Sequence, residues 1–290
     1  MKKLLLAGLL LASSSWALTV KDAKGDFTLD KTPERIVALE FSFVDALANV
    51  GVSPVGIADD NEPDRLLPAV RENVKEYQSV GTRSQPNLEV IANLKPDLII
   101  ADLNRHSASY DELRKIAPVV IFNSRYGSYD EILEQSQNIA DLVGKGDEMR
   151  KKIADLNQKV EEVKKIVPAG KTAFVAGARE DSFNIHSQSS YTGALLTKLG
   201  FKVPAQEGKE PIYPIGLEQV VALNPDVIFV AVYRDKSITD KWAKEALWQA
   251  VNAVKAKRVF NEDENLFARA RGLYAARGIL DAIQTALSQP

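Results

Sequence analysis

A thirteen-residue pattern that occurs twice constrains the fold of this chain more than any other feature of its sequence. The pattern is a short helix opening with Leu-Glu, a Pro-Asp turn and an apolar strand, and it spans residues 88–100 and 217–229. One copy in each half of the chain predicts two lobes of similar build, related by a pseudo-twofold axis. The carboxyl ends of parallel strands then face a crevice between the lobes, where we expect a ligand to bind.

Short β-branched runs alternate with helical stretches through most of the sequence, which is typical of βαβ units and a mostly parallel sheet. We expect strands in the first half at residues 35–39, 55–58, 98–101 and 119–122, and in the second half at 172–176, 183–185, 227–232 and 258–260. A chain of 290 residues is long enough for two hydrophobic cores. The sequence therefore predicts an α/β fold with two α/β units in tandem.

The expected connecting helix spans residues 147–167 and ends before Pro168 and Gly170. Its apolar residues are spaced alternately by four and three, which gives a narrow apolar stripe on a charged surface. At 1.5 Å per residue the helix is about 31 Å long, enough to cross from one lobe to the other. A surface helix within a single domain is the alternative, and the repeat disfavours it. We therefore expect an N-terminal α/β lobe at 18–146, an interlobe helix at 147–168 and a C-terminal α/β lobe at 169–290.

The first residues have the pattern of a cleavable signal peptide. Lys2 and Lys3 precede the apolar stretch 4–12, and a small-residue site ends at Ala17. We expect residues 1–17 to be removed and the mature protein to lie in the periplasm. The absence of cysteine excludes disulfides, thiolate metal sites and a lipid-bearing cysteine. With 39 acidic and 37 basic residues, the charge balance disfavours nucleic acid or anionic lipid as a partner.

Enzyme signatures are missing from the sequence. There is no G-x-S-x-G elbow, phosphate-binding loop or dinucleotide fingerprint, and the two histidines, His106 and His186, do not have metal-ligand spacing. We therefore expect no enzymatic activity, no cofactor and no metal ion bound directly by protein atoms.

Arginines cluster after the predicted strands, whereas lysines dominate the helices. A planar guanidinium matches the two oxygens of a carboxylate and remains charged, so several of them at one crevice suit a ligand with many carboxylates. A single arginine in a loop is more often simply solvated, so only the group as a whole indicates an anion site. The arginines in question are Arg83, Arg105, Arg125, Arg179, Arg234, Arg269 and Arg271.

Other polar residues are expected at the same rim. Tyr191, Tyr213 and Tyr233 are candidates to stack on the ligand or to donate hydrogen bonds to it, although isolated aromatic residues at loop edges more often serve packing. Ser42 precedes a predicted helix and is either an anion contact at the helix N-terminus or an N-cap.

Glu89 and Glu218 occupy the same place in the two copies of the repeat, in the first turn of a helix. A glutamate there complements the helix dipole by about 0.3 to 1 kcal/mol, which is one sufficient explanation. The pseudo-symmetry favours a second one, in which two exposed carboxylates, one on each lobe, contact basic pockets on a twofold-symmetric partner.

Several stretches resemble the iron–siderophore substrate-binding family of ABC importers, and in particular its ferric dicitrate-binding periplasmic members. The stretches are 56–61 (GIADDN), 79–83 (SVGTR), 95–102 (KPDLIIAD), 105–106 (RH), 215–219 (IGLEQ), 233–234 (YR) and 268–272 (ARARG). The resemblance covers nearly the whole mature chain and implies an α/β fold of two Rossmann-like lobes, joined by one long rigid helix, that move little on binding. We also expect the protein to be a monomer. It implies that iron arrives as a ferric chelate held by citrate, and that Glu89 and Glu218 contact arginines of the inner-membrane permease subunits.

The ligand-binding residues that we predict are Arg83, Arg105, Arg179, Tyr191, Tyr213, Tyr233, Arg234 and Arg269. The expected function is capture of ferric citrate, or of a similar carboxylate-type ferric siderophore, for delivery to an ABC permease. A carrier for a catecholate or hydroxamate siderophore or for cobalamin is an alternative within the family. From another class, an exported siderophore esterase would need a base beside Ser42, and no histidine is an obvious partner.

Overall fold

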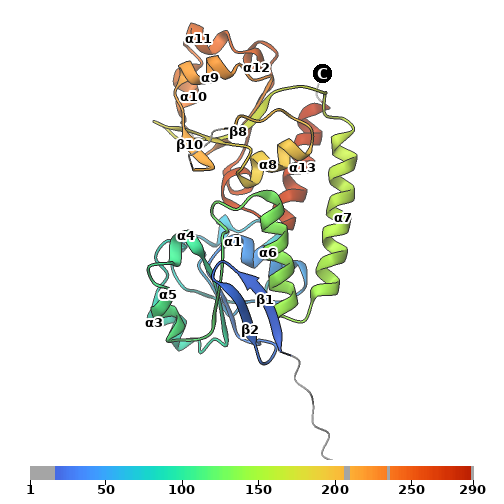
Figure 1. Cartoon of the computed structure of the whole chain (residues 1–290). Helices are drawn as coiled ribbons and strands as arrows, with labels where there is room; N and C mark the ends of the chain where they lie inside the picture. Colours follow the sequence, from blue (N-terminus) through green and yellow to red (C-terminus); the bar gives the residue numbers. More distant parts are fainter. Residues whose placement is uncertain (1–16, 206–209, 234–235, 289–290) are drawn as a thin grey trace, which may run out of the picture.

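The computed structural model describes residues 17–205, 210–233 and 236–288, and it has the predicted α/β fold of two lobes joined by a long helix (Figure 1). Each lobe is built on a five-stranded sheet. In the N-terminal lobe every pairing is parallel and the strand order is β5-β4-β3-β6-β7. These strands are β3 (Ile36–Ala38), β4 (Gly56–Ile57), β5 (Gln78–Ser79), β6 (Leu98–Asp102) and β7 (Val119–Phe122).

The C-terminal sheet has the order β10-β9-β8-β11-β12, and two of its pairings differ from a parallel arrangement. Strand β9 is antiparallel to both β8 and β10, because only residues 179–182 join β8 to β9. A parallel crossover needs about a dozen residues or more. The strands are β8 (Ala173–Ala178), β9 (Phe183–His186), β10 (Ile212–Pro214), β11 (Val227–Val232) and β12 (Val259–Asp263).

An N-terminal hairpin, which is absent from the strands expected from the sequence, extends the edge of the first lobe. It consists of β1 (Leu18–Asp22) and β2 (Gly25–Leu29). The carboxylate of Asp22 accepts the backbone N–H of Ile121 in β7 (3.1 Å), and the N–H of Ala23 donates to the Ile121 carbonyl (2.8 Å). These two bonds fasten the hairpin to the sheet.

The two copies of the repeat form the same structure in both lobes. Helices α3 (Leu88–Asn93) and α9 (Leu217–Leu223) lead through a left-handed residue, Lys95 (φ 47°) or Asn224 (φ 40°), to the Pro-Asp turn. The aspartate side chain then accepts backbone N–H groups just before the neighbouring strand. Asp97 binds the N–H of Arg35 (2.8 Å), and Asp226 binds the N–H of Thr172 (2.9 Å).

Two helices connect the lobes. Helix α7 (Gly146–Lys164) runs along one side of the molecule, and α13 (Leu273–Leu287) lies beside it (Figure 1). The first turn of α13 reaches α1 (Phe41–Asn49) of the N-terminal lobe, and every residue of α1 is buried. The C-terminal lobe is therefore attached to the other lobe at a second place besides α7.

The remaining helices cover the sheets. They are η1 (Pro63–Arg65), α2 (Pro68–Arg71), α4 (Leu103–His106), α5 (Tyr110–Arg114), α6 (Tyr129–Leu142), α8 (Tyr191–Lys198), α10 (Ile238–Trp242), α11 (Ala246–Gln249), α12 (Asn252–Lys255) and the π-helical turn η2 (Asn265–Arg269). Across the described ranges, none of the helices has the length and apolar character needed to cross a bilayer. The predicted signal peptide, apart from Ala17, lies outside the described residues.

Candidate functional site: an arginine-lined cavity between the lobes

A cavity of about 410 Å³ lies where the strand ends of the two lobes meet. Its volume is within the range of about 300 to 1,000 Å³ that is usual for small-molecule sites. Residues from both lobes line it: Arg83, Arg105, Arg125, Tyr126, Gly177, Arg179, Asn184, His186, Glu210, Ile212, Pro214, Tyr233, Ala268, Arg269 and Arg271.

Six of the seven arginines singled out in the sequence line this one cavity, three from each lobe. They come together because the carboxyl ends of parallel strands share one edge of a sheet. Arg105 and Arg125 follow β6 and β7, and Arg179 follows β8. Arg234 lies outside the described residues.

The three predicted tyrosines have different positions. Tyr233 lines the cavity, whereas Tyr191 at the start of α8 is 3% exposed and its hydroxyl donates to the Gly272 carbonyl (2.6 Å). Tyr213 lies in the core of the C-terminal lobe. Its neighbours on β10, Ile212 and Pro214, line the cavity, and alternation along a strand turns Tyr213 to the opposite face.

Arg83 is held by two carboxylates of its own lobe. Its Nη2 atom lies 2.8 Å from Asp60 Oδ2, and its Nη1 atom lies 3.6 Å from Glu40 Oε2. Burial opposes ionisation of Asp60, but Arg83 outweighs it and holds the pKa of Asp60 at about 2. Glu40, which is 1% exposed, also pairs with Arg105 Nε, so one buried carboxylate fixes two cavity arginines.

His106 supports the same arginine through the backbone. Its Nδ1 atom accepts the N–H of Asp102 (2.9 Å), and its Nε2–H donates to the carbonyl of Arg83 (2.8 Å). Burial lowers the pKa of His106, in agreement with a neutral ring that uses both nitrogens. The histidine is therefore a support for the Arg83 loop and does not line the cavity.

The carboxylate of Asp102 fixes the two loops that carry Arg105 and Arg125. Its Oδ1 atom accepts the N–H groups of Asn104 (3.0 Å) and Arg105 (2.8 Å). Its Oδ2 atom accepts those of Ser124 (2.8 Å) and Arg125 (3.0 Å). Asp102 is fully buried, and four backbone donors compensate its desolvation.

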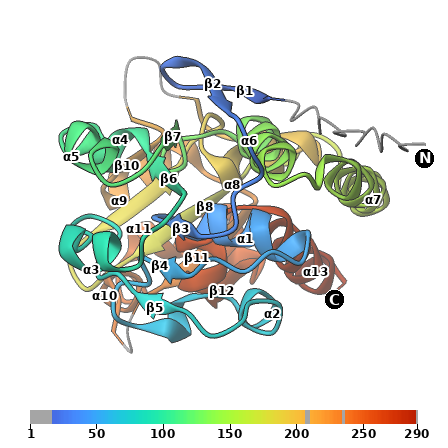
Figure 2. The same cartoon turned by 90° about the horizontal axis from the view of Figure 1, so that it is seen from below.

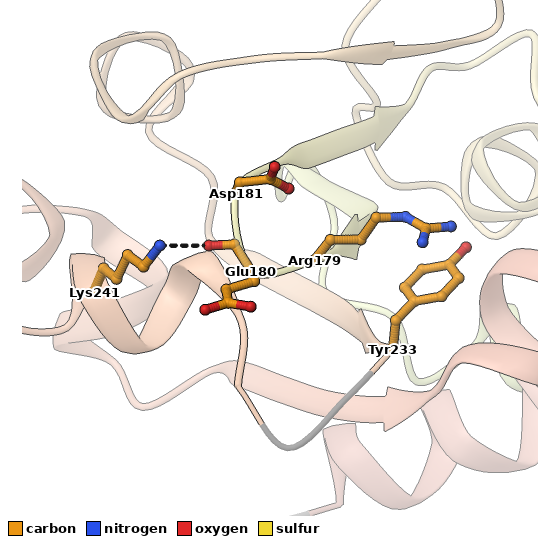
Figure 3. A pocket seen from close by; sticks show the side chains of 5 residues that line it. All are labelled: Arg179, Glu180, Asp181, Tyr233 and Lys241. Atoms are coloured by element: carbon orange, nitrogen blue, oxygen red, sulfur yellow. Dashed lines mark hydrogen bonds between the residues drawn. The ribbon is translucent and has the colours of Figure 1, made fainter.

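In the C-terminal lobe, two guanidinium groups lie close to the ring of Tyr233. The Cζ atom of Arg179 is 4.2 Å from the ring centroid, and that of Arg269 is 5.0 Å away. Figure 3 shows the guanidinium of Arg179 beside the ring of Tyr233. Cation–π contacts orient both arginines without neutralising them, and the one further ion pair between described residues here is the long contact of Arg269 with Glu264 (3.8 Å).

Arg271 is the most deeply buried arginine that lacks an ion pair among residues 17–205, 210–233 and 236–288. Burial lowers the pKa of its guanidinium, and the charge of Glu40 partly counteracts this effect. Burial, together with the charge of Arg271, also lowers the pKa of His186 to about 3, so that ring is neutral at pH 7. The deepest part of the cavity therefore holds a positive charge that a bound anion would neutralise.

A second pocket of about 400 Å³ adjoins the cavity and shares Arg179 and Tyr233 with it (Figure 3). Its other lining residues are Glu180, Asp181 and Lys241, and the ammonium group of Lys241 donates to the Glu180 carbonyl (2.8 Å). The two exposed carboxylates make this pocket less suitable for an anion than the arginine-lined cavity.

A protein-family model described as "Periplasmic binding protein" matches residues 36–266. The chain belongs to this periplasmic binding protein family. The Fe(3+) dicitrate-binding periplasmic protein FecB of Escherichia coli is 46% identical over 290 residues, covering 99% of this chain and 97% of FecB. The Fe(3+)-citrate-binding protein YfmC of Bacillus subtilis is 40% identical over 256 residues, covering 88% and 81% of the two chains. The resemblance inferred from the sequence is thereby confirmed.

Solved structures agree with the fold of the periplasmic binding protein family. The crystal structure of Staphylococcus aureus SirA complexed with staphyloferrin B has a TM-score of 0.82 and 26% sequence identity, and the match covers 93% of this chain and 98% of that chain. A relative whose name refers to dicitrate and a solved structure whose description refers to staphyloferrin B are therefore both similar to this one chain.

Glu89 and Glu218 are exposed, one on each lobe of this periplasmic binding protein. They lie in the first turns of α3 and α9, which Figures 1 and 2 place on the side of the molecule away from α7. Ser42 is buried, and its hydroxyl lies 2.7 Å from that of Ser124. Among the described residues, no three His, Cys, Asp or Glu side chains gather as a possible metal site.

Some residues of the site were not predicted from the sequence. Glu40 and Asp60 follow predicted strands as the arginines do, which is a usable signal. Tyr126 and Glu210 line the cavity from opposite lobes, and the Tyr126 hydroxyl donates to Glu210 (2.7 Å). No pattern in the sequence pairs these last two residues.

Proposed function

We propose that this protein binds ferric citrate, or a similar carboxylate-type ferric siderophore, in the interlobe cavity and delivers it to an inner-membrane ABC permease. The observation that carries the proposal is the lining of one cavity by six arginines from both lobes. Their six charges exceed those of the nearby carboxylates Glu40, Asp60, Asp102, Glu210 and Glu264. The identity to citrate-binding relatives supports the same ligand. Iron is the cargo and is held by citrate oxygens.

Titration of the purified mature protein with ferric citrate, followed by quenching of its tryptophan fluorescence, tests this ligand. We expect saturable binding with micromolar or tighter affinity, and weaker binding of iron-free citrate, because the chelate presents more charge in a fixed shape. Ferric complexes of a neutral hydroxamate and of a catecholate are the comparison ligands. Tighter binding of either one than of ferric citrate would refute the carboxylate assignment.

We propose that Glu89 and Glu218 contact basic residues of the two permease subunits. Both side chains are exposed and equivalent by the repeat, and the helices that carry them, α3 and α9, lie on one side of the molecule (Figure 1), so they suit a twofold-symmetric partner. Reversal of both charges, Glu89→Arg with Glu218→Arg, should abolish iron uptake and leave ligand affinity unchanged. Asp111, exposed in α5 of the N-terminal lobe, provides the control Asp111→Arg, which should leave uptake intact. Loss of ligand affinity in the double variant would contradict the assignment.

We propose that residues 1–17 are a signal peptide and that the mature protein acts in the periplasm as a monomer. The names of the relatives, which include periplasmic proteins and lipoproteins, support an extracytoplasmic location. N-terminal sequencing of protein recovered from the periplasmic fraction tests the cleavage site. A mature chain that begins at Leu18 is the expected result.

A further inference from the structure

Helix α1 contacts the arginine-bearing segments of both lobes, although none of its residues lines the cavity. Glu40, the N-cap residue, pairs with Arg83 and Arg105 of the N-terminal lobe. Ser42 is hydrogen-bonded to Ser124, the neighbour of Arg125. One turn further along, Asp45 reaches into the other lobe.

Asp45 caps the first turn of α13 from the opposite lobe. Its Oδ1 atom accepts the N–H of Leu273 (2.7 Å), and its Oδ2 atom accepts the N–H groups of Tyr274 (3.1 Å) and Ala275 (3.2 Å). The N-cap residue of α13, Gly272, has no side chain to serve these donors. A buried carboxylate at a helix N-terminus also interacts favourably with the helix dipole.

The backbone at Gly272 is adapted to this contact. Its φ of 127° suits glycine, and a Cβ atom placed there would lie 2.4 Å from the carboxyl group of Asp45. On the other side, the hydroxyl of Tyr191 donates to the Gly272 carbonyl (2.6 Å). The turn that follows Arg271 is therefore fixed by one side chain from each lobe.

We propose that Asp45 is a positioning residue, which holds the Arg269–Arg271 segment of the C-terminal lobe in register with Arg83 and Arg105 of the N-terminal lobe. The two acidic anchors, Glu40 and Asp45, are five residues apart on one buried helix, a separation of about 7.5 Å along its axis. Because a helix is stiff over that length, it fixes the offset between the two sets of arginines. The inference rests on the proposed function, since it assigns these arginines to ligand binding.

This arrangement gives the cavity its shape before the ligand arrives. A charge-assisted hydrogen bond depends on geometry, and arginines that are already ordered lose less conformational entropy on binding. Without the cap, the turn at Gly272 would lose its hydrogen bonds to the N-terminal lobe, and the position of Arg271 relative to Arg83 and Arg105 would depend on apolar packing alone. The ligand would then bind more weakly to a less well-defined site.

The first test compares Asp45→Leu and Asp45→Asn with a matched control, Asp97→Leu. Asp97 also accepts two backbone N–H groups, from Glu34 and Arg35, but entirely within the N-terminal lobe. Titration with ferric citrate should show at least about tenfold weaker binding for Asp45→Leu. Asp45→Asn should recover part of the affinity, because it keeps an oxygen acceptor. Asp97→Leu should lose thermal stability but not affinity. Unchanged affinity in Asp45→Leu, or an equal loss in Asp97→Leu, would overturn the proposal.

The second test needs no ligand. The sequence has no cysteine, so exposed Lys75 and Lys244, one on each lobe, can be replaced by cysteine and spin-labelled without background. The distance distribution between the labels should broaden in Asp45→Leu and, to a lesser extent, in Asp45→Asn, but not in Asp97→Leu. A distribution as narrow as that of the unaltered chain in both Asp45 variants would refute the positioning role. Failure of the unaltered protein to bind ferric citrate would instead refute the proposed function, while the label distances still decide the role of Asp45.

Discussion

Replacement of Arg271 by methionine should weaken ligand binding and at the same time stabilise the ligand-free protein. Arg271 is only 8% exposed, burial lowers the pKa of its guanidinium, and it forms no ion pair within the described part of the chain. In the empty cavity its charge is therefore poorly compensated. In the proposed complex, a carboxylate of the chelate would compensate it.

The size of both effects follows from this burial. Loss of one member of a buried, hydrogen-bonded charge pair costs about 2 to 5 kcal/mol of binding free energy. A value inside that range, about 3 kcal/mol, corresponds to a more than hundredfold higher Kd. An apolar side chain of similar volume in place of a buried ionic group is neutral to stabilising by about 1 to 4 kcal/mol. We expect the lower end, about 1 kcal/mol, because Glu40 already interacts with Arg271.

Fluorescence titration with ferric citrate measures the first effect, and thermal unfolding of the ligand-free protein measures the second. For a chain of this length the expected rise in Tm is about 2 °C. Arg125→Met is the matched control, because Arg125 lines the same cavity but is exposed. It should lose less affinity and leave the Tm unchanged. A fall in Tm together with unchanged affinity for Arg271→Met would refute the reasoning, since Arg271 would then be a structural residue.

Three further predictions concern acidic residues and one glycine. Burial raises the pKa of Asp45 to about 7. Protonation of Asp45 therefore favours the folded state, with full effect below about pH 4, and this stabilisation is lost as the pH rises through 7. Asp45→Asn, which cannot ionise, should flatten the decline in Tm between pH 5 and pH 8. Burial acts against ionisation of Asp60, yet Arg83 holds the pKa of Asp60 at about 2. Asp60→Asn should therefore lower the free energy of unfolding by about 2 kcal/mol at pH 7. Urea denaturation should show a smaller loss at pH 3. An alanine at position 272 would be strained at φ 127°, and its Cβ atom would collide with Asp45. Gly272→Ala should therefore lower the free energy of unfolding by more than about 3 kcal/mol in urea denaturation. A loss below about 1 kcal/mol would contradict the structure.

The sequence was most informative where a pattern has one structural solution. The Leu-Glu to Pro-Asp repeat predicted equivalent helix–strand units, and Asp97 and Asp226 explain why the pattern needs aspartate. Six arginines could be assigned to one cavity because the ends of parallel strands meet by topology. The antiparallel pairing of β9 was missed, although the short connection after β8 already excluded a parallel crossover.

Side-chain direction was the part that could not be predicted. Tyr191 and Tyr213 both belong to elements near the cavity. The hydroxyl of Tyr191, however, donates to the Gly272 carbonyl, and the side chain of Tyr213 faces the core. Glu40 and Asp45 were missed because charged residues on a helix are normally expected at its surface. Helix α1 is buried on all sides, so its acidic residues find partners inside the molecule, which only the packing of both lobes reveals.

The guanidinium-rich cavity has a consequence for any solution that contains this protein. The chain as a whole has a formal charge of −2, yet its crevice concentrates positive charge in a confined space. Small buffer anions such as phosphate and sulfate will gather there and compete with the cargo, and dissolved salt will slow its capture. The affinity for the ligand should therefore differ between phosphate and a zwitterionic buffer. Only the value measured in the zwitterionic buffer approaches the intrinsic affinity.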